Sequence, residues 1–423
     1  MYPKVLVISG SDFLTVENQS SITLKSLFEI WPKHKLSLIV CGDFNVNRKN
    51  EDKIEKFYLS VKDISILKHI FKETRVPTAE GDNLIPVIPN ESSLIFKIKR
   101  TFKLFLTDTL SLFPYESSNK LLNFINAVQP DVIYSTVENL RIITILMEIH
   151  RKFKIPFVPH FYDDFPKILF SSPFSIFYRL YFNNAVARLI SQSKSCLCIG
   201  EAMCMEFSNR YNQFNFLPLM NSVEKYYGEE EPNNFIYLDR KLRICYTGGL
   251  HLKRADVIVS ICKSFDYFLK NEIELYIYSS HKDWDFHKDK FSSFNFIHYR
   301  GTYKKDDFFK FTSQSDVLLH VESFDFSIRN YTRFSISTKL PEYLSTGKLI
   351  LAIGPSDIAS MMYLIENKAA LIINDVNNLN LINEVLQYLY YGNISDVRFN
   401  AQSLFFRNHL RQDNIETLMK ALS

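Results

Sequence analysis

Short apolar runs alternate with longer amphipathic stretches along most of the chain. In the first half, the apolar runs Lys4–Ser9, Lys35–Gly42 and Pro130–Thr136 predict buried strands. A helix is predicted between the first two runs, and strand, helix and strand in this order form a βαβ unit with a right-handed crossover. A second helix is predicted over Leu140–Phe153, after the third run. In the second half, strands separated by helices are predicted at three runs, Glu274–Ser280, Phe294–Gly301 and Asp316–Glu322. The pattern predicts an α/β protein whose parallel sheets are covered by helices on both faces.

The segment from Ser337 to Pro355 gives the clearest helix-to-strand signal. An amphipathic helix is predicted over Thr338–Thr346, and a strand buried on both faces is predicted over Leu349–Ile353. Gly347 suits the end of the helix because glycine takes a left-handed backbone conformation without a Cβ clash. Glu342 stands in this helix among apolar neighbours, where a carboxylate needs a partner. The alternative is a half-exposed helix carboxylate without a function.

Composition indicates the size and the broad class of the protein. With 423 residues, the chain is long enough for two domains of roughly 200 residues each. An apolar content of 46% and a charged content of 23% are those of a soluble globular protein, and a net charge of +4 is too small to indicate nucleic-acid binding. The six cysteines lack zinc-like spacing and are interpreted as free thiols of a reducing compartment. Because neither a signal peptide nor an apolar run of about 18 to 20 residues is visible, we expect a cytoplasmic protein.

Small and polar residues follow several predicted strands. Ligands bind at the carboxyl ends of the strands in open α/β sheets, so Gly10 and Ser11 are candidates for substrate contacts. The alternative is an ordinary connecting loop, and no G-x-G-x-x-G fingerprint of a dinucleotide site is present. His160, Asp163 and Asp164 end another predicted strand, where an imidazole can donate and accept hydrogen bonds near neutral pH. A structural histidine satisfied by a carboxylate is the alternative, and a metal site has less support.

Two further stretches are suited to binding phosphate. Gly248 and Gly249 separate a predicted strand from a helix, and glycines there let backbone amides approach a phosphate at the helix N-terminus. Ser337, Thr338 and Lys339 offer hydroxyls, amides and one full charge at the start of the later helix. Helix capping is the alternative role for Ser337.

A basic and aromatic stretch covers residues 94–110 and predicts an amphipathic helix. Such a helix can lie on an anionic membrane surface, where each Lys or Arg contributes on the order of 1 kcal/mol. The alternative is a helix that packs on the sheet and exposes its basic side to solvent.

Several of these segments together resemble the GT-B glycosyltransferases, in particular the large retaining group called family 4. "EYLSTGKLIL", which begins at Glu342, is similar to the family segment in which a glutamate holds the ribose hydroxyls of the donor nucleotide. "HFYDDFP", which begins at His160, is similar to the strand end that places a histidine near the transferring sugar. The chain departs from the family at Phe334, where a first glutamate would fall, and at Gly249, where relatives carry an arginine.

The resemblance also implies roles for further residues. It implies that Lys253 or Arg254 contacts the diphosphate and that Arg300 is the polar candidate near the nucleotide base. Glu322 or Asp325 is expected to stand in for the missing first glutamate. The residues expected to act in catalysis are then His160, Lys253, Arg254 and Glu342.

The architecture implied by the resemblance is GT-B, with two Rossmann-like parallel-sheet domains that face each other across a cleft. Residues 1–217 are expected to form the acceptor domain, 218–404 the nucleotide-sugar domain, and 405–423 a helix that crosses back to the first domain. The implied activity is transfer from a nucleoside-diphosphate sugar, with retention and without a metal or other cofactor. The implied acceptor is a bacterial surface glycan or a lipid-linked glycan, reached from the cytoplasm or from the inner face of the membrane. The alternatives are a GT-B sugar-nucleotide epimerase or hydrolase and a non-catalytic nucleotide- or glycan-binding relative.

Overall fold

The computed structural model describes most of the chain in two units. The described residues are 2–15, 19–41, 54–59, 117–168, 176–228, 240–269, 272–303 and 305–423. One compact unit is formed by Met1–Leu219 with Ile415–Ser423, and the other by Met220–Asn414. The basic stretch 94–110 lies outside the described residues, so its predicted membrane contact stays a prediction. None of the described helices combines the length and the apolar character that a membrane crossing requires.

The first unit is a seven-stranded parallel sheet with the strand order β3-β2-β1-β4-β5-β6-β7. Its strands are β1 (Val5–Ser9), β2 (Leu36–Val40), β3 (Glu55–Tyr58), β4 (Val132–Thr136), β5 (Phe157–Phe161), β6 (Cys196–Cys198) and β7 (Phe216–Pro218). Its helices are α1 (Gln19–Phe28), α3 (Asn119–Val128), α4 (Leu140–Phe153), α5 (Phe165–Ile168), α6 (Ile176–Gln192) and α7 (Glu201–Tyr211). The order reverses between β1 and β4, and Val5 of β1 pairs in parallel with Leu36 of β2 on one side and with Val132 of β4 on the other.

Helix α4 shows how the sequence sets the elements of this unit. The Asn139 side chain accepts a hydrogen bond from the Ile142 amide at 3.0 Å and caps the helix. Residues of one face, including Leu146 and Ile149, are fully buried against the sheet. The helix covers the residues that the periodicity of the sequence predicts. The short edge strand β3 was not predicted, because its pattern of exposed and half-buried residues gives little signal.

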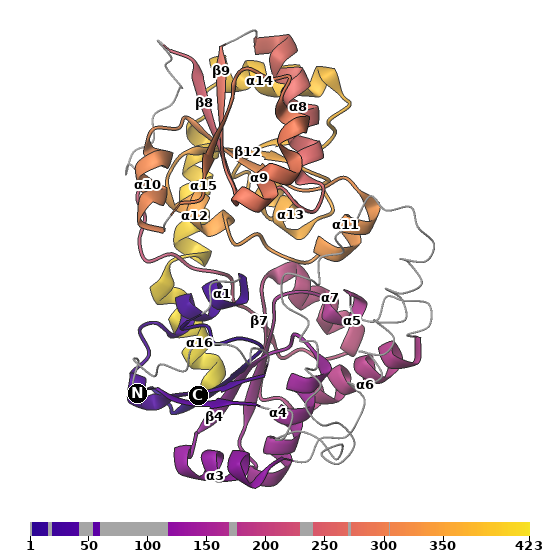
Figure 1. Ribbon diagram of the computed structural model, residues 1–423, viewed down its shortest axis with the longest axis vertical. Helices are drawn as coiled ribbons and strands as arrows, with labels where there is room; N and C mark the ends of the chain where they lie inside the picture. The colour runs from indigo at the N-terminus through magenta and orange to yellow at the C-terminus, as the bar shows by residue number, and fades with distance from the viewer. Residues whose placement is uncertain are drawn as a thin grey trace. The chain divides into compact units, whose positions relative to one another are not determined.

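The chain end packs on the first unit. Helix α16 (Arg411–Leu422) is drawn in yellow in Figure 1. Its residues Leu418, Ala421 and Leu422 belong to the same buried cluster as Val5 and Val7 of β1. Residues 405–414, which were expected to belong to this crossing segment, lie in the second unit.

The second unit is a six-stranded parallel sheet with the order β10-β9-β8-β11-β12-β13. Its strands are β8 (Leu242–Thr247), β9 (Ile273–Tyr278), β10 (Ile297–Gly301), β11 (Val317–Val321), β12 (Leu349–Ile353) and β13 (Leu371–Ile373). Its helical elements are α8 (Arg254–Leu269), α9 (His281–His287), η6 (Lys288–Phe291), α10 (Lys305–Ser313), α11 (Phe326–Thr332), α12 (Leu340–Ser345), α13 (Ala359–Glu366), α14 (Leu379–Tyr391) and α15 (Ser395–Asn408). The order reverses between β8 and β11, so each unit is a doubly wound, Rossmann-like sheet.

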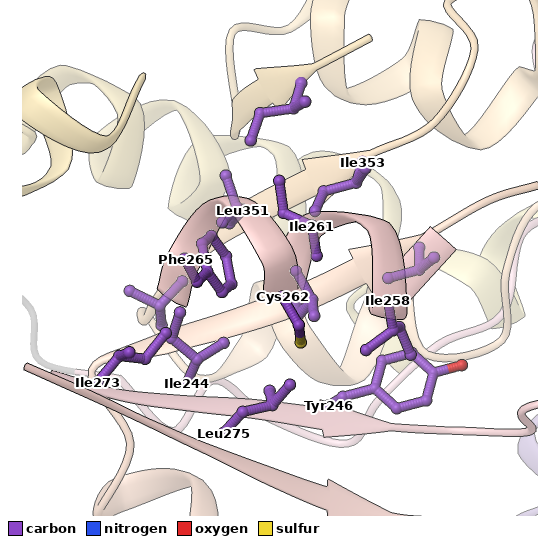
Figure 2. Close-up of a cluster of buried hydrophobic side chains, with 14 of the residues drawn as sticks. Ile244, Tyr246, Ile258, Ile261, Cys262, Phe265, Ile273, Leu275, Leu351 and Ile353 are labelled. Atoms are coloured by element: carbon purple, nitrogen blue, oxygen red, sulfur yellow. The ribbon is translucent and has the colours of Figure 1, made fainter. Parts of the chain in front are cut away.

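Helix α8 anchors the core of the second unit. Its buried side chains Ile258, Ile261 and Phe265 face the strand residues of β8, β9 and β12 (Figure 2). Burial of one such side chain contributes roughly 1.5–3 kcal/mol. The packing fixes the start of α8 at Arg254, after the turn of residues 251–253 that follows the glycines. Cys262 lies in the same cluster. All six cysteines are free thiols, as predicted, and the structure shows that all six are buried.

Around Glu342, the structure confirms most of the predicted pattern. Strand β12 has the predicted bounds, and Gly347 has the left-handed φ of +67° expected at the helix end. Helix α12 begins at Leu340, later than the predicted Thr338, because Pro341 has no N–H and occupies the first turn.

Candidate functional site

The candidate site lies at the carboxyl edge of the second sheet, where the strand order reverses. Strands β8 and β11 are neighbours there, and they end in Thr247 and Val321. Gly248 and Gly249 follow the first of them and Glu322 follows the second. Ligands of open α/β sheets bind outside such a reversal.

The glycine loop has a backbone conformation that its sequence permits. Gly248 has a φ of +148°, which L side chains rarely adopt. The Tyr246 hydroxyl donates to the Gly249 carbonyl at 2.6 Å. The loop is therefore shaped by its own strand before any ligand binds.

Tyr343 ties the helix of Glu342 to the same loop. Its hydroxyl accepts a hydrogen bond from the Thr247 amide at 2.9 Å and lies 3.0 Å from the Thr247 hydroxyl. It also lies 3.3 Å from the Leu319 carbonyl of β11. Because Tyr343 is buried, this contact fixes α12 against the ends of β8 and β11. The position of Tyr343 on the predicted helix indicated only an apolar contact, so the sequence did not predict that its hydroxyl would bind Thr247.

Lys339 and Glu342 form a pair beside this anchor. The Lys339 ammonium lies 3.0 Å from the Glu342 carboxylate and 2.7 Å from the Tyr303 hydroxyl. Burial opposes the charge of Lys339, but Glu342 and Tyr303 together raise its pKa above the usual value. The Lys339 and Glu342 side chains are 26% and 18% exposed, so both remain reachable by a ligand. The structure thus brings together two predicted site residues and adds Tyr303.

Arg254 and Glu322, by contrast, are engaged in a buried network. The Arg254 guanidinium lies 3.3 Å from one Glu322 oxygen, and the Ser360 hydroxyl donates to the other at 2.9 Å. His320 lies 3.5 Å from the same carboxylate. Burial opposes the charge of Glu322, yet Arg254, His320 and Ser360 hold its pKa below the usual value. Both oxygens of Glu322 are therefore occupied within the protein, which argues against a ribose contact.

Lys253 pairs differently from its neighbour. Its ammonium lies 2.5 Å from Asp325, which also caps α11 by accepting from the amides of Ser327 and Ile328. The Lys253 side chain is 41% exposed. The Asp325 carboxylate thus accepts hydrogen bonds from both the Lys253 ammonium and the first amides of α11, while the Lys253 side chain stays at the surface.

The remaining predicted residues of this unit contribute less to the cluster. The Ser337 hydroxyl accepts from the Lys339 amide at 3.4 Å and closes a turn, and Thr338 is half-buried in that turn. Arg300 lies on β10, where its guanidinium stands 5.0 Å from the centre of the Tyr276 ring. β10 is the edge strand, separated from β8 by β9, so Arg300 is not brought to the glycine loop.

In the first unit, His160 is a buried histidine bonded to tyrosines. Its Nδ1 lies 2.6 Å from the Tyr134 hydroxyl, which in turn lies 2.8 Å from the Tyr162 hydroxyl. Burial lowers the pKa of His160 to about 3, although the Leu219 backbone opposes the shift, so the imidazole is neutral at neutral pH. The expected alternative partner was a carboxylate, and the structure shows tyrosine instead.

The aspartates after β5 have separate environments. Asp164 is buried, and Arg210 donates to its two oxygens at 2.6 and 2.7 Å. Such a bidentate pair indicates a structural role. Asp163 is half-buried next to it.

Gly10 and Ser11 follow β1 at the strand-order reversal of the first sheet. A Cβ on Gly10 would lie 2.3 Å from Glu138 Oε2, so a larger residue there would require this carboxylate to move. The Ser11 and Ser21 hydroxyls lie 3.3 Å apart. Glu138 follows β4, and sequence reasoning missed it because no motif surrounds it. Within the described ranges of both units, no group of three or more His, Cys, Asp and Glu residues is arranged to hold a metal ion.

Buried neutral histidines predict acid sensitivity of the second unit. Burial lowers the pKa values of His320 and His409 to about 4, from 6.5. The unfolded state then binds more protons between these values, so stability falls as the pH drops from about 6.5 to 4. At pH 5 each of the two histidines is expected to lower the free energy of unfolding by about 2 kcal/mol relative to neutral pH.

Calorimetric unfolding midpoints between pH 7.5 and 5 measure this effect. His409→Gln is expected to flatten the pH dependence, and a His281→Gln control on an exposed histidine is expected to keep it. A midpoint that does not fall toward pH 5 would contradict the assignment.

Comparison with solved structures identifies the fold. No family model matches the sequence, and a search of curated proteins finds no match. The N-terminal domain of Candida albicans trehalose-6-phosphate phosphatase is similar over 100% of this chain and 97% of its own, with 10% identity and a TM-score of 0.61. WaaG, a glycosyltransferase involved in lipopolysaccharide biosynthesis, is similar over 99% of both chains, with 11% identity and a TM-score of 0.56. UDP-GlcNAc 2-epimerase from Neisseria meningitidis is similar over 98% of this chain and 99% of its own, with 14% identity and a TM-score of 0.50. The protein has the predicted two-domain α/β fold of GT-B type.

Proposed function

We propose that the protein is a glycosyltransferase whose donor, a nucleoside-diphosphate sugar, binds at the carboxyl edge of the second sheet. The observation that carries this proposal is the cluster of Glu342, Lys339 and the Gly248–Gly249 loop, joined by the contact between Tyr343 and Thr247. A carboxylate, a cation and a glycine loop at a strand-order reversal suit a ribose followed by phosphates. The similarity of the fold to WaaG supports the same class of reaction.

The residues of the cluster have distinct proposed roles. The Glu342 carboxylate accepts hydrogen bonds from ribose hydroxyls, and Lys339 with the Gly249 amide binds the diphosphate. The Gly248 amide already donates to the Tyr278 carbonyl at 3.0 Å. Negative charge grows on the leaving diphosphate in the transition state, so groups already placed there lower the barrier without reorganisation. Lys253, exposed beside the loop, is a second cation for the diphosphate, whereas Arg254 keeps Glu322 charged and buried. This assignment requires neither a metal nor another cofactor.

The finer proposals concern the stereochemistry and the acceptor. The resemblance at Glu342 and His160 supports a family-4-like enzyme that retains the anomeric configuration of the donor. His160, uncharged and hydrogen-bonded to Tyr134, is suited to hold a hydroxyl of the sugar or of the acceptor and not to carry charge. The proposed acceptor is a bacterial surface glycan, free or lipid-linked.

Titration of nucleotides into the protein tests the donor site. One of UDP, GDP, ADP and dTDP is expected to bind by calorimetry, and Glu342→Gln is expected to weaken that binding by about 1–3 kcal/mol through lost hydrogen bonds to a charged acceptor. Glu384→Gln changes an exposed carboxylate on α14 and serves as the matched control. If none of the four nucleotides binds to the folded protein, the proposed donor site is wrong.

An epimerase or hydrolase is the second candidate, because the fold is also that of UDP-GlcNAc 2-epimerase. The products distinguish the candidates when the matching sugar nucleotide is supplied without an acceptor. A transferase leaves the donor nearly intact, an epimerase yields an isomeric sugar nucleotide, and a hydrolase releases free sugar. A protein that binds the nucleotide but turns over no donor with any glycan acceptor is the non-catalytic relative.

A further inference from the structure

Tyr303 is held in one position beside the Lys339 ammonium. It follows β10, two residues after Gly301, whose left-handed φ of +76° turns the chain toward the site. Its ring centroid lies 5.0 Å from that of Phe311 and 5.9 Å from that of Phe308, in edge-on and tilted contacts. The hydroxyl end of this ring meets Lys339 at 2.7 Å. Together with Tyr278, whose ring centroid also lies 5.9 Å away, these aromatic neighbours fix the ring, and the ring fixes the lysine.

The hydrogen bonds of Lys339 leave one donor for a ligand. An ammonium carries three N–H donors, and Tyr303 and Glu342 each accept one of them. Of these two partners only Glu342 bears a negative charge. When two hydrogen bonds hold a flexible lysine, its third N–H is directed toward one defined position.

The other cations near the glycine loop are held differently. Lys253 is paired with Asp325 and Arg254 with Glu322, each through a carboxylate that is itself fixed by other contacts. Lys339 also contacts a carboxylate, that of Glu342, but it has in addition a neutral partner, the Tyr303 phenol, which positions the ammonium without adding a second negative charge.

We propose that Tyr303 is a positioning residue that aims Lys339 at the diphosphate of the donor. This inference rests on the proposed function and adds to it a residue that makes the site prefer a nucleoside diphosphate over the bare nucleoside. Glu342 serves the ribose and thus both ligands, whereas the pair of Tyr303 and Lys339 serves only the phosphates.

The experiment compares each diphosphate with its own nucleoside. UDP and uridine, GDP and guanosine, ADP and adenosine, and dTDP and thymidine are titrated by calorimetry into the wild type, and the pair that binds is carried forward. Tyr303→Phe is expected to weaken diphosphate binding about tenfold, as for one lost hydrogen bond to a charged group, while nucleoside binding stays within about twofold. Lys339→Met is expected to reduce the difference in affinity between the diphosphate and its nucleoside more than Tyr303→Phe does.

Tyr299→Phe is the matched control for the lost hydroxyl. Tyr299 lies on β10 four residues earlier, and its hydroxyl contacts His281 at 3.0 Å and the Ser279 carbonyl, not Lys339. It is expected to leave both affinities unchanged. Unfolding midpoints of the three variants verify that each one is folded.

The outcomes separate this inference from the proposed function. If no diphosphate binds the wild type, the proposed function fails and the role of Tyr303 fails with it. If a diphosphate binds the wild type and Tyr303→Phe equally well, the role of Tyr303 is overturned and the donor site stands. Equal weakening of nucleoside and diphosphate by Tyr303→Phe would show a merely structural role and would also overturn the inference.

Discussion

Replacing Lys339 by methionine is expected to lower kcat for sugar transfer by about 10²- to 10³-fold. Methionine has a similar length and keeps the apolar contacts of the stem, but it brings no charge to the leaving diphosphate. The pKa of Lys339, raised by Glu342 and Tyr303, keeps the ammonium charged in the wild type. Because the diphosphate gains charge as the glycosidic bond breaks, the loss is expected to be greater in kcat than in KM.

The measurement is steady-state transfer with the donor whose nucleotide binds in calorimetry. Lys348→Met provides the control, since Lys348 follows the same helix and donates to the Ser313 carbonyl at 3.1 Å, away from Glu342. Lys348→Met is expected to keep kcat within about twofold, because the Lys348 ammonium bonds to a carbonyl away from the proposed donor site. A Lys339→Met enzyme that keeps its kcat and changes only in KM would show that Lys339 binds the donor equally in ground and transition states.

The sequence predicted the sheets well because their signal is local. Apolar runs of five or six residues identified strands such as β1 and β12, and Gly347 marked a helix end through its own backbone freedom. Helix α4 was predicted over its full length, since its cap at Asn139 and its apolar face both lie within one stretch. The edge strand β3, with no buried face to pattern it, was missed.

The site was predicted in part, because its contacts cross the sheet. Lys339 and Glu342 lie three residues apart in one helical turn, so the sequence could place them together. Tyr303 lies 36 positions from Lys339, and Tyr343 lies 96 from Thr247. These contacts depend on which strands are neighbours in the sheet, and the local periodicity of the sequence does not predict strand order. An aromatic residue in a loop or helix gives no signal that its hydroxyl is used.

Charged residues were the hardest to assign from sequence. A charge can be counted without knowing its partner, so Arg254 and Lys253 were equal candidates for the diphosphate. The structure separates them through partners 68 and 72 positions away, Glu322 and Asp325. Asp164 shows the same limit, since its partner Arg210 lies on a helix 46 positions later.

Replacing Arg254 by methionine is expected to destabilise the second unit by about 3–5 kcal/mol. The Glu322 side chain is only 4% exposed. Without Arg254, the partners left for its carboxylate are the Ser360 hydroxyl and His320, and neither carries a positive charge near pH 7. The pKa of Glu322, held low in the wild type, is then expected to rise as the carboxyl takes up a proton in order to stay buried. Unfolding midpoints at pH 7.5, with and without the nucleotide that binds, measure the loss.

Two further variants distinguish a buried ion pair from a phosphate ligand. The double change Arg254→Met and Glu322→Leu is expected to recover most of the stability, because it removes the charge that the single change leaves uncompensated. Lys253→Met breaks the adjacent exposed pair with Asp325 and is expected to cost no more than about 1 kcal/mol. If Arg254→Met instead keeps its midpoint and loses nucleotide binding, the guanidinium belongs to the diphosphate. A stability loss that the double variant repairs, with nucleotide affinity restored along with the fold, assigns Arg254 to the scaffold and leaves Lys339 and Lys253 as the cations of the proposed donor site.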